Sequence, residues 1–346
     1  MRGVFVLGMH RSGTSAAARL VNLLGVPTCL DEDLLRTTKH NPRGYWESAS
    51  LTAFNDRLLD LLECDWSCPP ALASGWEQDE SLARLRDEAA DLFTTVFPTE
   101  QWVWKDPRNC VTFAFWAACL AGLQPVVVLV HRNPLEIAES LRARDGCGAF
   151  YSLALWERYL RGCLDSLVGL PTLVTDYESL VADALAWSEG TRAFLDGAGV
   201  ATGRLRAEDA LAFVDPDLRH AAFTADDLRG APALSEPQRR LFDALEQLRG
   251  VHERLPEVAL PEETPTTEAL LGERRLARAD ERAARRQYEE LETYTRELGA
   301  RFVELEEYAR GLQQQYAALE EYARGLRERH DTLEEYARGL QARLGG

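Results

Sequence analysis

Short apolar runs alternate with longer amphipathic stretches along the first 180 residues. The runs have the length of strands buried in a sheet, and they lie at residues 3–8, 101–105, 125–131 and 171–175. The stretches between them have helical periodicity, and they lie at residues 14–25, 48–63, 79–97, 111–121, 134–144 and 149–168. This alternation predicts an α/β fold with a doubly wound parallel sheet flanked by helices.

The pattern changes after residue 255. Prolines then stand among acidic residues and threonines, which is typical of a linker, and helical sequence resumes about a dozen residues later. We therefore divide the chain into a first domain (1–255), a linker (256–267) and a helical C-terminal segment (268–346).

The C-terminal segment contains an internal repeat. Leu-Glu-Glu-Tyr-Ala-Arg-Gly-Leu occurs at residues 305–312, 319–326 and 333–340, and residues 291–298 are a diverged copy. The period of 14 residues equals two heptads, with leucine at a and tyrosine at the first d, and it predicts a coiled-coil helix. Arginine or glutamine at the second d and a glycine inside each repeat weaken the apolar seam that the a and d positions form, so we expect the segment to be stable when paired. We expect a homo-oligomer, through a parallel or an antiparallel pair; a single solvated helix and a docking strip for another protein are the other possibilities.

A glycine-bounded loop follows the first apolar run. Gly8 and Gly13 permit a tight turn and a close approach to a ligand, and the amides of the following helix start favour an anion. The spacing matches the Gly-x-x-x-x-Gly part of the nucleotide triphosphatase P-loop, but Thr14 and Ser15 stand where that motif has lysine and then serine or threonine. Arg11 is then the cation inside the loop. The loop predicts a phosphorylated nucleotide as ligand, or else a tight turn from strand to helix without one.

Two further cations come at the ends of predicted strands, where open α/β sheets bind their ligands. Lys105 ends the second apolar run and Arg132 follows the third. Ser140 and Arg144 lie four residues apart on one face of the next helix, so with Arg132 they form a second candidate anion site. Lys39 and Lys105 are the only lysines among 39 basic residues, which favours a need for a compact ammonium at position 105. Alternatively, Lys105 has only a structural role, and Arg144 is a solvated charge on the helix surface.

A candidate base lies in the loop over residues 40–47, His-Asn-Pro-Arg-Gly-Tyr-Trp-Glu. The proline and glycine give this loop a defined, non-helical path between two predicted helices. Glu47 could reach the crevice from the side of a second substrate, although an acid is also favourable in the first turn of a helix. His40 is a second candidate, because the ordinary pKa of histidine lies near neutrality.

These segments resemble, in the same order, those of sulfotransferases that use 3′-phosphoadenosine 5′-phosphosulfate (PAPS). Gly-Met-His-Arg-Ser-Gly-Thr-Ser at residues 8–15 is similar to their 5′-phosphosulfate loop, in the version with arginine in place of lysine found in tyrosylprotein and bacterial sulfotransferases. The resemblance covers the first 180 residues in recognisable blocks and extends more loosely to about residue 260. It implies a loop that binds the 5′ end of PAPS through Arg11, Ser12, Gly13, Thr14 and Ser15. It likewise implies a 3′-phosphate site made of Arg132, Ser140 and Arg144.

Three more segments fit the same resemblance. Lys-Asp-Pro at residues 105–107 is similar to the segment that supplies the catalytic lysine of tyrosylprotein sulfotransferases, and Asn-x-x-Gly-Tyr-Trp-Glu resembles the segment that delivers their catalytic glutamate. Tyr177, in Tyr-Glu-x-Leu-Val, matches a tyrosine that approaches the cofactor, although it could equally be a packing residue. The resemblance implies in-line transfer of the sulfuryl group of PAPS to an acceptor hydroxyl, with Glu47 as base, Lys105 and Arg11 facing the departing nucleotide, and no metal. The acceptor could be a glycan, a lipid, a peptide or a small metabolite.

Two other functions remain compatible with these residues. A kinase-like phosphotransferase of the P-loop type needs an acid at a strand end to hold Mg²⁺, and Asp106 is such an acid. A non-catalytic nucleotide-binding scaffold would instead act through its coiled coil. Residues 215–220 look similar to a segment of the same family, but their chemistry selects no role.

Charge and cysteine content limit the setting. The formal net charge of −17 opposes nonspecific binding to nucleic acid or to acidic membranes. The seven cysteines are odd in number and lack the spacing of zinc ligands, which favours buried free thiols in a reducing compartment. The first apolar run ends by Met9, too early for a signal peptide or a membrane anchor. We therefore expect a cytoplasmic protein with a hydroxyl-bearing acceptor, without nucleic-acid partners and without a membrane span.

Overall fold

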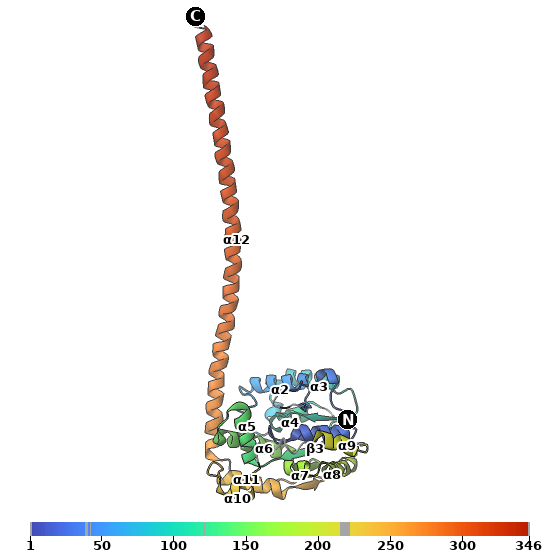
Figure 1. The fold of residues 1–346 in the computed structure, drawn as a ribbon. Coiled ribbons are helices and arrows are strands. Elements are labelled where there is room, and N and C mark those ends of the chain that lie inside the picture. The colour runs from blue at the N-terminus through green and yellow to red at the C-terminus, as the bar shows by residue number, and fades with distance from the viewer. Residues whose placement is uncertain (1, 39–40, 42, 121, 215–221, 345–346) are drawn as a thin grey trace. The chain divides into compact units, whose positions relative to one another are not determined.

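The computed structural model describes residues 2–38, 41, 43–120, 122–214 and 222–344. The chain forms two compact units, Met1–Arg278 and Ala279–Gly346. The first unit contains a central sheet and its helices (Figure 1). The second unit is the continuation of the last helix, α12 (Pro265–Leu344).

The sheet has five strands in the order β2-β1-β3-β4-β5. Four of them are parallel and match the four predicted strands to within one residue at each end: β1 (Arg2–Leu7), β2 (Gln101–Lys105), β3 (Gln124–His131) and β4 (Thr172–Asp176). The fifth, β5 (Gly250–His252), pairs antiparallel with β4 at the sheet edge. The sequence did not predict β5, because a strand of three residues contains too little periodicity to be recognised.

Helices flank the sheet and include the six predicted ones. These are α1 (Thr14–Leu23), α2 (Ala49–Leu61), α3 (Ala83–Val96), α4 (Asn109–Cys119), α5 (Pro134–Asp145) and α6 (Ala149–Leu167). Further helices follow β4: α7 (Tyr177–Ala182), α8 (Ala184–Gly197), α9 (Ala207–Phe213), α10 (Ala225–Gly230) and α11 (Glu236–Gln247). The chain is thus an α/β protein with a mostly parallel sheet and a C-terminal helix.

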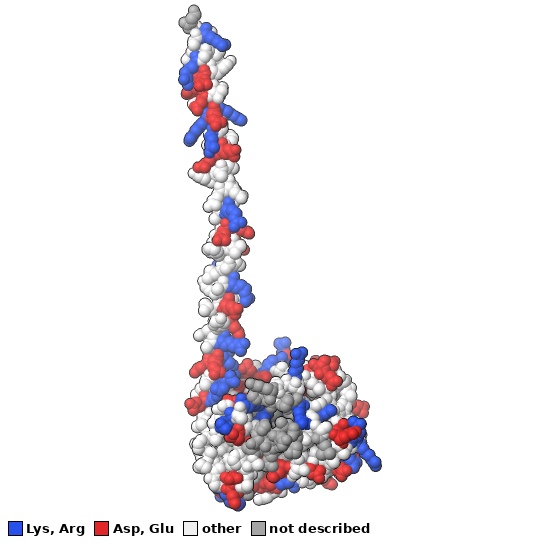
Figure 2. Space-filling view, viewed as in Figure 1, with Lys and Arg blue, Asp and Glu red and all other residues white. Residues whose placement is uncertain are grey.

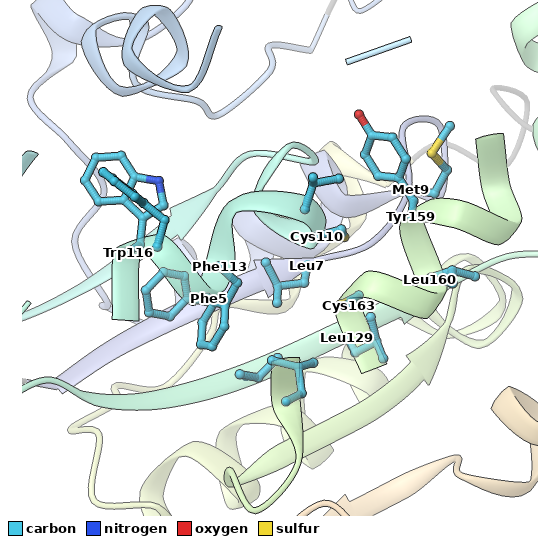
Figure 3. Packing of buried hydrophobic residues seen from close by; sticks show 14 of the residues in the cluster. Phe5, Leu7, Met9, Cys110, Phe113, Trp116, Leu129, Tyr159, Leu160 and Cys163 are labelled. Atoms are coloured by element: carbon cyan, nitrogen blue, oxygen red, sulfur yellow. The ribbon is translucent and has the colours of Figure 1, made fainter. Parts of the chain in front are cut away.

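Alternate residues of β1 pack against opposite layers of helices, as the pleat of a strand requires. Val4 and Val6 belong to a buried cluster with side chains of α1, α8 and α9. Phe5 and Leu7 belong to a larger cluster with side chains of α2, α3, α4 and α6. Figure 3 shows part of the larger cluster, where the rings of Phe5 and Phe113 meet edge to face at 5.0 Å. Both faces of the central strands are therefore buried, which fixes the carboxyl ends of the strands at one edge of a rigid sheet.

The first unit extends past residue 255, where the sequence placed its end, because the following residues pack against α6. Glu157 of α6 is fully buried and accepts hydrogen bonds from the amide of Thr264 at 2.9 Å and from Oγ1 of Thr267 at 2.8 Å. Thr264 directly precedes α12, which begins at Pro265 inside the expected linker, and Thr267 lies in its first turn. The segment expected to connect two parts is instead built into the first of them, as far as Arg278.

The second unit presents the leucines and tyrosines of the repeat to solvent. Their exposed fractions at the a and first d positions range from 41% for Leu340 to 67% for Tyr308. Acidic and basic side chains are mixed along the helix (Figure 2). No helix within the described ranges combines enough length with enough apolar character to span a bilayer.

Candidate active site

The turn between β1 and α1 is tight and has room only for glycine at two positions. Gly8 and Gly13 have φ angles of 149° and 92°. A Cβ atom on Gly13 would lie 2.2 Å from Cδ2 of Tyr177, and one on Gly8 would lie 2.3 Å from the carbonyl oxygen of Val130. Because α1 begins at Thr14, its first amides have no acceptor one turn earlier in the helix. The turn therefore has the form of an anion cradle at a helix N-terminus.

Side chains connect this turn to the end of β3 and to α5. Arg132 follows β3 directly; its Nη1 donates to the carbonyl oxygen of Arg11 at 3.0 Å, and its Nε donates to Oε2 of Glu136 at 2.6 Å. Nε of Arg11 donates to Oγ of Ser140 at 2.9 Å. The guanidinium of Arg132 also lies 4.3 Å from the ring centroid of Tyr177. The structure thus places the residues of the two expected anion sites in direct contact.

Glu47 and Lys105 form a buried ion pair. Oε1 of Glu47 contacts Nζ of Lys105, and the two residues are 6% and 3% exposed. Burial raises the pKa of Glu47, and the neighbouring ammonium of Lys105 offsets part of that rise. Glu47 precedes Ser48, whose side chain caps α2 by accepting from the amide of Leu51 at 3.0 Å. Glu47 therefore lies before the first turn of α2, so a favourable interaction inside that turn does not explain its position.

Positive charge is concentrated around the loop. Burial, and then the nearby guanidinium groups of Arg144 and Arg132, lower the pKa of Arg11 below its usual range. Arg144 also pairs with Asp145 at 2.7 Å and lies 5.1 Å from the ring centroid of Trp66. An anion bound among these groups would relieve their mutual repulsion. The electrostatics of this part of the site therefore favour a ligand with negative charge.

A cleft of about 910 Å³ opens at the carboxyl ends of the parallel strands. It is the place where open α/β sheets bind ligands. Ten of the residues expected from the sequence line it: Arg11, Gly13, Thr14, Ser15, Glu47, Lys105, Arg132, Ser140, Arg144 and Tyr177.

Two of the expected residues stand apart from that group. The side chain of Ser12 is buried, and its Oγ has no hydrogen-bond partner within the described residues. It lies beneath the turn, where a Cβ on Gly8 would come within 2.6 Å of it, so the hydroxyl does not line the cleft. His40, the second candidate base, lies outside the described residues, as do residues 215–220.

The cleft also contains aromatic and imidazole groups that the sequence did not single out. The ring of His10 lies 4.8 Å from that of Trp66 and 5.5 Å from that of Tyr159. Burial, followed by the charges of nearby arginines and Lys105, lowers the pKa of His10 well below its ordinary value, so its imidazole is neutral at neutral pH. His10 stands inside the loop motif, but only the fold brings Trp66 to it. Its position within the loop motif was the one feature of the sequence that could have marked His10 as a residue of the cleft.

Arg108 is a second residue that the sequence did not single out, and in the fold it contacts three acidic side chains. Its Nε donates to Oδ1 of Asp56 at 2.7 Å, its Nη1 donates to Oδ1 of Asp106 at 3.1 Å, and its Nη1 lies 3.9 Å from Oε2 of Glu47. The other oxygen of Asp106 accepts from Nδ2 of Asn55 at 2.9 Å. Asp106 is fully buried in this network and does not line the cleft.

The likeness of this chain to known proteins is structural. No family model matches the chain, and no curated protein sequence matches it. Among solved structures, it is similar to the sulfotransferase domain from the curacin biosynthetic pathway, with 15% sequence identity and a TM-score of 0.36, over 79% of this chain and 97% of that one.

Proposed function

We propose that the first unit is a sulfotransferase that moves the sulfuryl group of PAPS to a hydroxyl of an acceptor. One observation supports this proposal above all others. The residues of the two expected anion sites and a buried carboxylate–ammonium pair line one cleft at the end of a parallel sheet.

The residues of the cleft fit such a donor. The cradle around Gly13 has no space for a side chain, which suits a backbone that approaches a phosphosulfate closely. Arg132 and Ser140 lie on the side of Arg11 that faces α5, where a 3′-phosphate would accept their hydrogen bonds. Tyr177 fills the space between Gly13 and Arg132 and would limit the position of the nucleotide.

The reaction is assigned to the remaining residues. The bound donor supplies a sulfur atom that an acceptor oxygen attacks while the bond to the bridging phosphate oxygen breaks. Glu47 accepts the proton of the acceptor hydroxyl, and its raised pKa brings the carboxyl closer to the working pH of a general base. Lys105 and Arg11 stabilise the negative charge that grows on the bridging oxygen. His40 stays a second candidate for the base. The acceptor is proposed only by class, as a glycan, a lipid, a peptide or a small metabolite.

The kinase alternative finds less support in this cleft. A phosphotransferase of the P-loop type holds Mg²⁺ with an acid at a strand end. Asp106 occupies that place in the sequence, yet both of its oxygens accept hydrogen bonds from Arg108 and Asn55. A scaffold without catalysis would have no use for a buried ion pair in its cleft, because unpaired apolar residues would be at least as stable there.

Nucleotide binding tests the donor assignment. We expect the full chain to bind 3′-phosphoadenosine 5′-phosphate at least about tenfold more tightly than AMP in calorimetric titrations, because the 3′-phosphate gains charged hydrogen bonds. Arg132→Gln should remove this difference. Arg142→Gln, on the exposed side of α5 where Arg142 pairs with Glu139, should leave it unchanged. Binding of ATP only, and only with Mg²⁺, would overturn the proposal.

Turnover tests the base. With ³⁵S-labelled PAPS and a panel of hydroxyl compounds, Glu47→Gln should lower kcat by about 10²- to 10⁴-fold while 3′-phosphoadenosine 5′-phosphate still binds. Intact turnover in this variant would show that another group takes the proton.

A further inference from the structure

The second unit presents an apolar stripe that no part of the described chain buries. The stripe consists of the leucines at the a positions and the tyrosines at the first d of each repeat, and all of them are exposed. In each full repeat the tyrosine is followed by a small residue at e and by glycine at g, as in Tyr308, Ala309 and Gly311. The stripe therefore alternates large side chains with gaps at a spacing of 14 residues, about 21 Å along the helix.

The repeated glycines have no explanation within one copy of the chain. Gly311, Gly325 and Gly339 lie inside α12, where glycine is less favourable than alanine. A Cβ atom added at any of them would have no described atom within 4 Å. The space they leave is therefore available to a neighbour. Because tyrosines and gaps recur with the same period on one surface, a second copy of this surface is complementary to it.

We propose that residues 291–343 pair with the same segment of a second copy in antiparallel orientation, with the twofold axis at the level of Ala317 along the helix. Residues at equal distances before and after Ala317 then face each other. Leu312 faces Tyr322 of the second copy, and Leu326 faces Tyr308. This register is the one that gives every leucine at an a position of the segment a partner at a d position.

Charge decides the orientation. Arg301, Arg329 and Arg343 occupy the second d of the repeats. In a parallel pair in register, each would face its own copy inside the seam, and like charges would repel. In the antiparallel register each faces a leucine that has a glutamate beside it: Arg301 faces Leu333 and Glu334, Arg329 faces Leu305 and Glu304, and Arg343 faces Leu291 and Glu292.

The flanks of the seam are compatible with this register. From residue 305 to residue 340 the e and g positions carry no acidic residue, lysine or arginine, so the charges of this stretch lie at b, c, f and the second d. Gly311 of one copy lies across from Ala323 of the other, and Gly325 lies across from Ala309, so small residues face each other and the two backbones can approach closely beside the tyrosines. The pairing would therefore bury the stripe without placing like charges at the e and g positions that flank it between residues 305 and 340.

Sedimentation equilibrium of the full chain tests the association. We expect a dimer, and we expect Leu312→Glu combined with Leu326→Glu to raise its dissociation constant at least about 100-fold. Val303→Glu adds an acid at an f position, away from the stripe, and should leave the dimer intact. A chain that stays monomeric at all concentrations, or a dimer that is insensitive to the double variant, would overturn the proposal.

Cysteine cross-linking tests the orientation and the register. The seven native cysteines lie between residues 29 and 163, so the segment itself has none and the unmodified chain gives the background. A mixture of Leu312→Cys and Tyr322→Cys chains should form a disulfide between the two variants upon mild oxidation. Tyr336→Cys, at the same heptad position one repeat later, should not link to Leu312→Cys. Disulfides formed by each variant with itself would show a parallel pair and contradict the antiparallel register.

Discussion

Replacing Lys105 by methionine would leave the carboxyl of Glu47 buried without its main counter-charge. The methionine keeps most of the length and apolar volume of the lysine stem, so the change acts mainly on charge. Glu47 then has Arg108 as its nearest cation, with Nη1 at 3.9 Å from Oε2. An isolated buried carboxylate takes up a proton rather than remaining charged, so the pKa of Glu47 should rise further in this variant.

Protonation limits how much this change can destabilise the protein. Keeping a carboxyl of ordinary pKa 4.5 protonated at pH 7 costs about 3.4 kcal/mol, so the loss of stability at pH 7 should approach about 3 kcal/mol. A group whose folded pKa is raised contributes stability below its unfolded pKa and loses that contribution as the pH rises. The destabilisation should therefore shrink to about 1 kcal/mol near pH 5.5.

Urea unfolding followed by tryptophan fluorescence measures this effect, because all eight tryptophans lie between Trp46 and Trp187 in the first unit. Combining Lys105→Met with Glu47→Gln removes both charges and should restore stability to within about 1 kcal/mol of the wild type, without the pH dependence. Arg57→Met, which breaks the exposed pair with Glu88, should lose less than about 1 kcal/mol. The argument would be refuted if Lys105→Met lost less stability than Arg57→Met, or if its loss of stability did not change with pH.

Three further predictions concern other parts of the first unit. Gly13→Ala places a Cβ against the ring of Tyr177 at a positive φ, so nucleotide affinity in calorimetry should fall at least about tenfold, and unchanged affinity would contradict the cradle. Burial lowers the pKa of His131 to about 4, so its contribution to folding is present above pH 6.5 and decreases by roughly 3 kcal/mol as the pH falls towards 4. The free energy of unfolding of His131→Leu, measured in urea, should therefore depend less on pH over this range than that of the wild type. An equal pH dependence in both proteins would argue against the reasoning. Glu157→Ala leaves the buried amide of Thr264 unsatisfied and should destabilise the unit by about 3 kcal/mol or more in the same assay, whereas a loss below about 1 kcal/mol would show that the start of α12 is held by other contacts.

The features that the sequence predicted well are those that leave a local pattern. The four parallel strands and six helices followed from periodicity over 5 to 19 residues, and the turn after β1 followed from two glycines at a fixed spacing. The compact unit ends at Arg278 instead of residue 255, and contacts such as the one between Glu157 and Thr264, which are 107 residues apart, tie the intervening segment to it. No local pattern shows that a proline-containing segment will cover a buried carboxylate.

The candidate site shows the same division. Residue types at strand ends were sufficient to select Lys105 and Arg132, because parallel strands bring their carboxyl ends to one edge, and the glycine-bounded loop was sufficient to select Arg11. The direction of the Ser12 hydroxyl depends on the φ angles of the turn, and the stacking of His10 depends on Trp66, which comes from a loop after α2. Such features depend on how separate elements pack together, so they became visible only in three dimensions.

The contact between Glu47 and Lys105 has a kinetic consequence for the proposed reaction. A carboxylate oxygen that already holds an ammonium cannot take a proton from an alcohol at the same point, so the lysine has to turn away first. The sulfo group of the donor is an anion that could draw it away. In its resting state the proposed enzyme would therefore keep this oxygen of Glu47 occupied, and an alcohol that arrived early would be unable to transfer its proton to that oxygen. Steady-state kinetics would then follow a compulsory sequence in which the nucleotide enters first and leaves last.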